Sequence, residues 1–154
     1  MSRTAGVIAP PPLLYLGGLG AGLLADRLLA LPPVGLPMGV RMGIGLALGM
    51  CGAALIATAL GRFGRAGTPA EPWRPTTALA TGGVYRLTRN PMYLGMAFLL
   101  FALAVGFDSL GTLLLFPVVV LVVDRFVISR EELYLSGQFG APYDAYRLKV
   151  RRWL

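Results

Sequence analysis

The stretch Met42–Gly61, MGIGLALGMCGAALIATALG, decides the fold class because it carries no charged residue. A helix needs about 20 consecutive apolar residues to cross the hydrocarbon core of a bilayer, and this stretch has that length. The composition of the whole chain agrees, with 56% hydrophobic residues, 14% charged residues and a mean hydropathy of +0.69. Such a composition is typical of a membrane protein rather than of a water-soluble globule.

Three further apolar segments predict a polytopic helical protein. Asn90 to Phe107 is uncharged, and so is Ser109 to Val123, which can lengthen through the mixed segment after Asp124. Leu13 to Ala25 follows three prolines and lacks a clear small-residue cleavage site, which favours a retained helix over a secretory signal. We therefore predict one all-α membrane domain over residues 1–154, with about four spans near 12–31, 39–61, 91–107 and 110–128 and a C-terminal interfacial amphipathic helix.

The basic residues predict how the chain is oriented. Five arginines lie in the segment 62–90, which we expect to be a loop, and five basic residues lie in the segment 129–154: Arg130, Arg147, Lys149, Arg151 and Arg152. Only Arg27 and Arg41 border the first connection. By the positive-inside rule, both segments and both termini face the cytoplasm, in the inner (cytoplasmic) membrane. The net charge of +7 lies in the loops of a hydrophobic chain, so membrane lipids are expected partners and nucleic acid is not.

The residue inventory excludes several kinds of catalysis. There is no histidine, and the single cysteine, Cys51, lies within the second span. An intrachain disulfide and a Ser-His or Cys-His nucleophile are therefore impossible, and no metal site is expected. Glycines four residues apart, such as Gly45 and Gly49, indicate close packing of helices.

The segment between the second and third spans is rich in glycine and proline and long for a linker. Loops of that length are usually functional or disordered, so a lid over a substrate site and a plain connector both stay open. At its end, Asn90 precedes Pro91 at the start of the third span. We expect Asn90 to cap that helix and the helix N-terminus to favour an anionic group.

Two polar motifs border the spans. The first, Gly83 to Gly95, reads GVYRLTRNPMYLG and sets two arginines, an asparagine and two tyrosines against an apolar run. The second follows Asp124, where helical spacing puts Glu131 and Glu132 on adjacent edges of a helix that leaves the bilayer. From charge pattern alone, a solvated helix face is the plainer interpretation of these acids.

Together the two motifs resemble the signature of the integral-membrane isoprenylcysteine carboxyl methyltransferase and phospholipid methyltransferase family. The resemblance covers roughly Phe63 to the C-terminus and includes, after the first motif, Glu131-Glu132 and Phe139-Gly140. Asn90 stands where the best-known members carry histidine. The chain also lacks the additional N-terminal helices of the eukaryotic enzymes, which favours a smaller lipophilic acceptor over a prenylated protein.

The resemblance implies that the two motifs hold S-adenosylmethionine beside the membrane. Glu131 and Glu132 would balance the cationic methionine end, and Arg89 or the third helix's N-terminus would bind its carboxylate. Gly95 would allow close approach either of the ligand or of a neighbouring helix. The expected cofactor-binding residues are Tyr85, Arg89, Asn90, Pro91, Tyr93, Leu94, Gly95, Glu131 and Glu132. The expected catalytic residues are Arg89, Arg130 and Glu132, with either arginine holding a substrate carboxylate.

We therefore expect an S-adenosylmethionine-dependent methyltransferase, similar to the isoprenylcysteine carboxyl enzymes, acting on a lipophilic acceptor at a carboxylate, amine or thiol. Methyl transfer from a sulfonium needs positioning and exclusion of water more than a proton relay, so it tolerates the missing histidine. Two rivals stay open: an NADPH-dependent lipid or sterol reductase of related architecture, and a small membrane transporter or structural protein. The near absence of ionisable residues within the spans disfavours a transporter. The acceptor and the oligomeric state are left undetermined.

Overall fold

The computed structural model describes residues 5–71 and 74–154, and in this part of the chain the secondary structure is entirely helical, as predicted. In chain order the elements are α1 (Pro11–Leu28), α2 (Met38–Ala66), the 3₁₀ turn η1 (Gly83–Arg86), α3 (Pro91–Gly106), α4 (Leu110–Val123), the π-helical turn η2 (Asp124–Ile128), α5 (Ser129–Phe139) and α6 (Ala141–Lys149).

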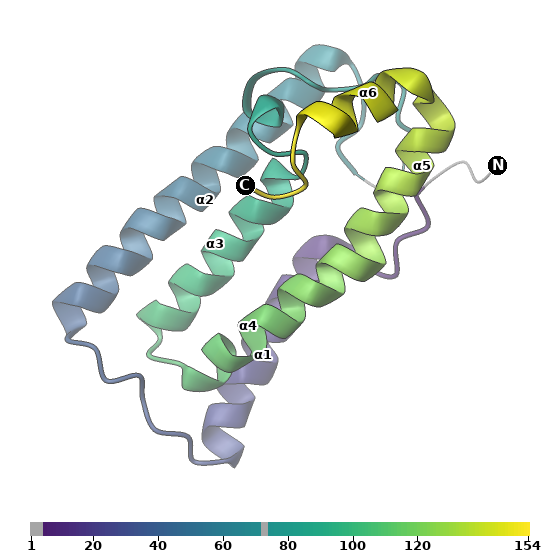
Figure 1. Ribbon diagram of the computed structural model, residues 1–154. Coiled ribbons are helices and arrows are strands. Elements are labelled where there is room, and N and C mark those ends of the chain that lie inside the picture. The colour runs from purple at the N-terminus through teal and green to yellow at the C-terminus, as the bar shows by residue number, and fades with distance from the viewer. Residues whose placement is uncertain (1–4, 72–73) are drawn as a thin grey trace.

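The four long helices form a bundle in which α2 packs on α3 and α1 packs on α4 (Figure 1). Consecutive helices run in opposite directions, and α3 also contacts α1 and α4. The connections 29–37 and 107–109 lie at one end of the bundle, here called the hairpin end (Figure 1). The segments 67–71, 74–90 and 129–154 lie at the opposite end, here called the motif end (Figure 1).

Close packing of α2 on α3 depends on two glycines. A Cβ atom at Gly52 would lie 2.6 Å from the Gly95 carbonyl oxygen, and one at Gly95 would lie 2.7 Å from the Gly52 carbonyl oxygen. Small residues allow two helix backbones to approach in this way, so Gly95 serves helix packing, one of its two expected roles. The expectation is wrong for Gly49, where a Cβ atom would meet no atom within 4 Å. The core beside the Gly52–Gly95 contact is a cluster of Tyr15, Tyr93, Ala97, Leu100, Val123, Val127 and Ile128.

Polar contacts close the hairpin end. Asp26 of α1 accepts hydrogen bonds from Ser109 Oγ at 2.5 Å and from the Gly111 amide at 2.6 Å, so it ties α1 to the start of α4. Asp108 pairs with Arg41 of α2 at 3.0 Å and accepts a hydrogen bond from the Gly35 amide at 3.1 Å. The connection 107–109 is therefore fixed to α1, to α2 and to the connection 29–37.

Two helices of the described chain are long and apolar enough to cross a membrane: α2, with 29 residues, and the continuous helix Leu110–Phe139, with 30 residues. α3 is apolar but has 16 residues. Large apolar side chains are exposed along the bundle, as is typical of helices that meet lipid: Leu13, Leu16, Leu24, Met42, Leu46, Met50, Leu114, Val118 and Leu121. Spans formed by α1 and α3 stay predictions.

The predicted loop 62–90 is wrong at its start, because α2 continues to Ala66 and ends at Gly67, whose φ of 62° is the left-handed conformation that glycine adopts without strain. The extra turn is supported by tertiary packing, since Phe63 meets the Tyr85 ring edge-on at 5.6 Å. The first predicted span, 12–31, likewise ends earlier, at Leu28.

Candidate functional site

A cavity at the motif end lies between the N-terminus of α3, the helices α5 and α6, and the loop after α2. Its lining includes residues of both sequence motifs: Tyr85, Arg89, Asn90, Pro91, Met92, Tyr93, Glu131, Glu132 and Leu135. The remaining lining residues are Phe63, Pro69, Ala70, Glu71, Thr76, Ala78, Leu79, Ala80, Tyr143 and Tyr146. The two motifs, far apart in sequence, therefore face one cavity.

Most of the residues predicted to bind the cofactor meet at this cavity, but three predicted site residues do not. Leu94 is buried in α3 and is not part of the lining. Gly95 faces Gly52, so its small size serves helix packing. Arg130 also lies outside the lining, and its Nη1 donates to the Gly6 carbonyl at 2.7 Å.

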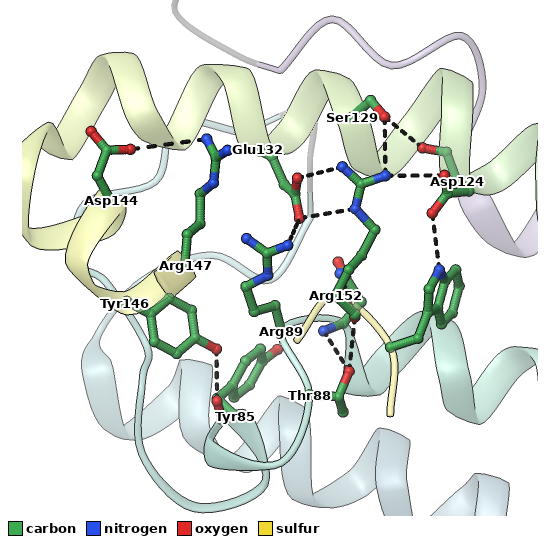
Figure 2. A network of polar contacts seen from close by, with 12 residues as sticks. Tyr85, Thr88, Arg89, Asp124, Ser129, Glu132, Asp144, Tyr146, Arg147 and Arg152 are labelled. Atoms are coloured by element: carbon green, nitrogen blue, oxygen red, sulfur yellow. Dashed lines mark hydrogen bonds and ion pairs between the residues drawn. The ribbon is translucent and has the colours of Figure 1, made fainter. Parts of the chain in front are cut away.

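Arg89 and Glu132 form an ion pair at the wall of the cavity, with 3.1 Å between Arg89 Nη2 and Glu132 Oε1 (Figure 2). Their side chains are only 12% and 8% exposed. Among the residues that the structure describes, the buried Nε of Arg89 has no hydrogen-bond partner. A buried donor left unpaired costs about 1–3 kcal/mol, so an acceptor atom of a ligand would stabilise this arrangement.

Glu131 has a different environment from its neighbour. Tyr93 Oη donates to Glu131 Oε2 at 2.8 Å, and no ion pair to Glu131 is found within residues 5–71 and 74–154. Tyr93 is itself fixed, because Tyr15 of α1 donates to its carbonyl oxygen at 3.0 Å. Glu132 is thus neutralised within the protein. Burial raises the pKa of Glu131 to about 7, and a cationic ligand beside it would favour its charged carboxylate form.

Arg152 is a residue of this end that the sequence reasoning missed. Its Nη2 lies 2.6 Å from Glu132 Oε2, and its Nη1 lies 3.0 Å from Asp124 Oδ2 (Figure 2). Trp153 Nε1 donates to Asp124 Oδ1 at 2.9 Å. No sequence signal distinguishes Arg152 from the basic residues around it.

The prediction of an interfacial helix at the end of the chain stays a prediction, although two of the aromatic residues in that segment pack within the protein. α6 forms, and its Arg147 and Lys149 are exposed as an interfacial helix requires. Tyr143 is instead buried, and Trp153 packs against the core cluster. The internal acids Asp124 and Glu132 draw Arg152 inward, because ion pairs and hydrogen bonds with them replace contacts with water.

The predicted capping role of Asn90 is also wrong. Asn90 occupies the position before α3, but its side chain makes no capping hydrogen bond. Its Nδ2 donates instead to the Arg152 carbonyl at 2.9 Å, a tertiary contact that competes with the cap. Pro91 does stand in the first turn of α3, as predicted.

The tyrosines around the cavity are held in their neutral form. Burial raises the pKa of Tyr146 to about 12, although nearby Arg89 lowers it. Burial also raises the pKa of Tyr85, with a further contribution from Glu131, and the pKa of Tyr143, with a further contribution from Glu132. These rings therefore offer apolar faces and phenol hydrogen bonds to a ligand at neutral pH.

The loop after α2 forms part of the cavity wall. The Thr76 amide donates to Tyr134 Oη on α5 at 3.2 Å, and the Thr77 amide donates to Thr68 Oγ1 at 2.9 Å. The loop is thus docked across the motif end by its own hydrogen bonds. The described part of the loop therefore forms part of the cavity wall, and its role as a lid stays a prediction.

Comparison with known proteins gives a match to one protein family. The model of the family described as phospholipid methyltransferase matches residues 40–142, which is more than half of the chain and includes both motifs. A protein of Haemophilus influenzae, named only as an uncharacterized protein, is 40% identical over 63 residues, which are 41% of this chain and 100% of that protein. No solved structure matches the chain.

Proposed function

Because the chain belongs to the phospholipid methyltransferase family, we propose that it transfers a methyl group from S-adenosylmethionine to a lipophilic acceptor that partitions into the membrane. The family implies a membrane protein with methyltransferase activity on a lipid-type substrate. The observation that carries the finer proposal is the meeting of the two motifs at one cavity, where, among the described residues, Arg89 Nε has no hydrogen-bond partner and Glu131 has no ion-pair partner.

The residues at the cavity suit S-adenosylmethionine. A carboxylate of the ligand is an acceptor for Arg89 Nε, the buried donor without a partner. A cationic centre of the ligand is balanced by Glu131, which lacks an ion-pair partner in the described chain. The rings of Tyr85, Tyr143 and Tyr146 offer apolar surface to the adenine.

In the mechanism that we propose, each of these residues has a separate role. When bound, S-adenosylmethionine supplies an electrophilic methyl group on a sulfonium. Glu131 holds the positive end in place, while Arg89, oriented by Glu132, holds the carboxylate end. The loop residues of the lining help exclude water: Pro69, Ala70, Glu71, Thr76, Ala78, Leu79 and Ala80. Alignment and desolvation are the main contributions required, since the chain has no histidine to relay protons.

We propose that residues 1–154 form one domain with four spans, α1, α2, α3 and α4. α1 and α3 pack along the two helices that are long enough to cross, so they would share the bilayer with them. The motif end would face the cytoplasm, because it holds most of the basic residues whereas Arg27 and Arg41 lie toward the hairpin end. The cavity would then lie at the inner surface of the cytoplasmic membrane, within reach of lipid headgroups.

The test is binding and transfer by the purified protein in lipid nanodiscs. We expect S-adenosylhomocysteine to bind and NADPH not to bind, and we expect label from methyl-labelled S-adenosylmethionine to appear in a membrane lipid extract. Arg89→Ala should reduce both signals, whereas Arg147→Ala, which removes an exposed arginine of α6 at the same end, should leave them within about twofold. Binding of NADPH without S-adenosylhomocysteine would favour the reductase and overturn the proposal.

A further inference from the structure

The segment of residues 150–154, here called the strap, lies between the two motifs, with Arg152 and Trp153 partly buried and Arg151 and Leu154 exposed. The Arg89 amide donates to the Arg151 carbonyl at 2.9 Å, and Thr88 Oγ1 donates to the Arg152 carbonyl at 2.9 Å. Thr88 is 1% exposed. The backbone of the strap is therefore bonded to the residues directly before α3.

The side chain of Arg152 extends from the strap to α5 and η2. Its Nη2 and Nε face the two oxygens of Glu132, at 2.6 Å and 3.3 Å, and its Nη1 lies 3.0 Å from Asp124 (Figure 2). Only an arginine can make this set of contacts, because its planar fork presents several donors at once. The hydrogen bond with Glu132 raises the pKa of Arg152, so the guanidinium stays charged.

Glu132 is consequently held from two sides. Arg152 contacts both of its oxygens, whereas Arg89 reaches only Oε1. Arg152 is not part of the cavity lining, but both Arg89 and Glu132 are. An effect of the Arg152 side chain on a ligand therefore passes through Glu132 and Arg89, whereas the backbone carbonyl of Arg152, which contacts the lining residue Asn90, is kept in every side-chain variant.

We propose that Arg152 is a positioning residue that fixes the carboxylate of Glu132, so that Arg89 is held by one nitrogen and presents its free Nε to the anionic end of the methyl donor. This inference rests on the proposed function. Without Arg152, Glu132 has Arg89 as its remaining ion-pair partner in the described chain and can rotate to take both of its nitrogens. The donor would then lose its carboxylate anchor.

The alternative is that the strap only stabilises the fold. Trp153→Phe provides the matched comparison, because it removes the hydrogen bond of the strap to Asp124 and leaves every contact with Glu132 in place. If the strap only stabilises the fold, variants at both positions should weaken donor binding in proportion to their loss of thermal stability. A positioning role predicts that Arg152 variants weaken binding far more than that proportion.

The experiment measures S-adenosylhomocysteine affinity, the KM for the donor, kcat and the Tm without ligand. We expect Arg152→Gln to raise Kd and donor KM about tenfold, with kcat changed less than about threefold, since an anchor made equally in ground and transition states acts on KM. Arg152→Lys should recover part of the affinity, because it keeps the charge without the fork. Trp153→Phe should leave donor KM within about twofold. Equal donor affinity in the wild type and Arg152→Gln would overturn the inference.

A second measurement needs no donor and covers the case in which Arg152→Gln is poorly folded. We expect the decreases in Tm caused by Arg152→Lys and Glu132→Gln to be non-additive, because both disturb the same pair. Additive decreases would show that Arg152 does not hold Glu132 and would overturn the inference. Failure of the wild type to bind S-adenosylhomocysteine, with non-additive decreases, would instead overturn the proposed function and leave the pairing itself supported.

Discussion

Both ends of the bundle carry acidic and basic side chains, but the ends differ in whether the carboxylate oxygens already have partners within the protein. At the hairpin end, both oxygens of Asp26 and both oxygens of Asp108 accept hydrogen bonds or ion pairs from within the protein. At the motif end, the described residues give Glu131 one hydrogen bond, at Oε2, and no ion pair. An acid whose oxygens are all occupied holds a fold together, whereas an acid with a free oxygen in a cavity can bind a ligand.

An arginine nitrogen without a hydrogen-bond partner does not by itself distinguish a binding site from a structural cluster. In the described part of the chain, Arg41 and Arg89 each bury an Nε without a hydrogen-bond partner. Arg89 lines the cavity together with Glu131. Arg41 lies outside the lining of the hollow at the hairpin end, and the two acids of that lining, Asp26 and Asp108, are already occupied. The combination of a free donor, a free acceptor and a shared cavity therefore separates the candidate site from a structural cluster.

The largest effect is expected at Glu131. Glu131→Gln keeps the shape of the side chain but removes the charge that faces a cationic donor, so we expect kcat/KM to fall about 100-fold, in line with ~3 kcal/mol for a buried charged interaction. Methyl transfer to lipid extract at several donor concentrations measures it. Asp144→Asn, at an exposed acid of α6, should stay within about twofold of wild type. Equal losses in both variants would contradict a special role for Glu131.

The opposite result is expected at the hairpin end. Asp26→Ala removes the acceptor for Ser109 and Gly111, and we expect the free energy of unfolding to fall by about 2–4 kcal/mol. Donor affinity per folded molecule should not change. Thermal unfolding in nanodiscs, with and without S-adenosylhomocysteine, separates the two effects. A variant that is stable but does not bind donor would show that the hairpin end takes part in function.

The helices and the pairing of the motifs could be predicted because each has a local signal. Uncharged runs set the helices, and the order Arg89-Asn90-Pro91 followed by Glu131-Glu132 indicated the cavity on the basis of a family resemblance. Arg152 could not be predicted, because its partners Asp124 and Glu132 are set only by the tertiary fold. The cap at Asn90 failed for the same reason, since a tertiary acceptor replaced the local one.

Gly95 tests whether a residue of the first motif belongs to the binding site or only to helix packing, and its expected effect is smaller. Gly95→Ala puts a methyl group against the Gly52 carbonyl, and overpacking of this kind costs about 1–3 kcal/mol. Gly49→Ala is the control, because a Cβ there meets no atom within 4 Å and alanine favours a helix. We expect only Gly95→Ala to lower the Tm, with donor affinity unchanged. Weaker donor binding in a fully stable Gly95→Ala protein would return Gly95 to the binding site.

The smallest effect concerns Tyr146, whose hydroxyl donates to the Tyr85 carbonyl at 2.7 Å. Tyr146→Phe should cost about 1 kcal/mol of stability at neutral pH. Because burial raises its pKa from about 10 to about 12, the unfolded chain loses this proton first as pH rises. The contribution of Tyr146 is thus complete below pH 10 and is lost as pH rises toward 12. Unfolding curves of wild type and Tyr146→Phe across that range should converge; parallel curves would mean that the phenol is not buried, and the cavity wall at α6 would then be open to water.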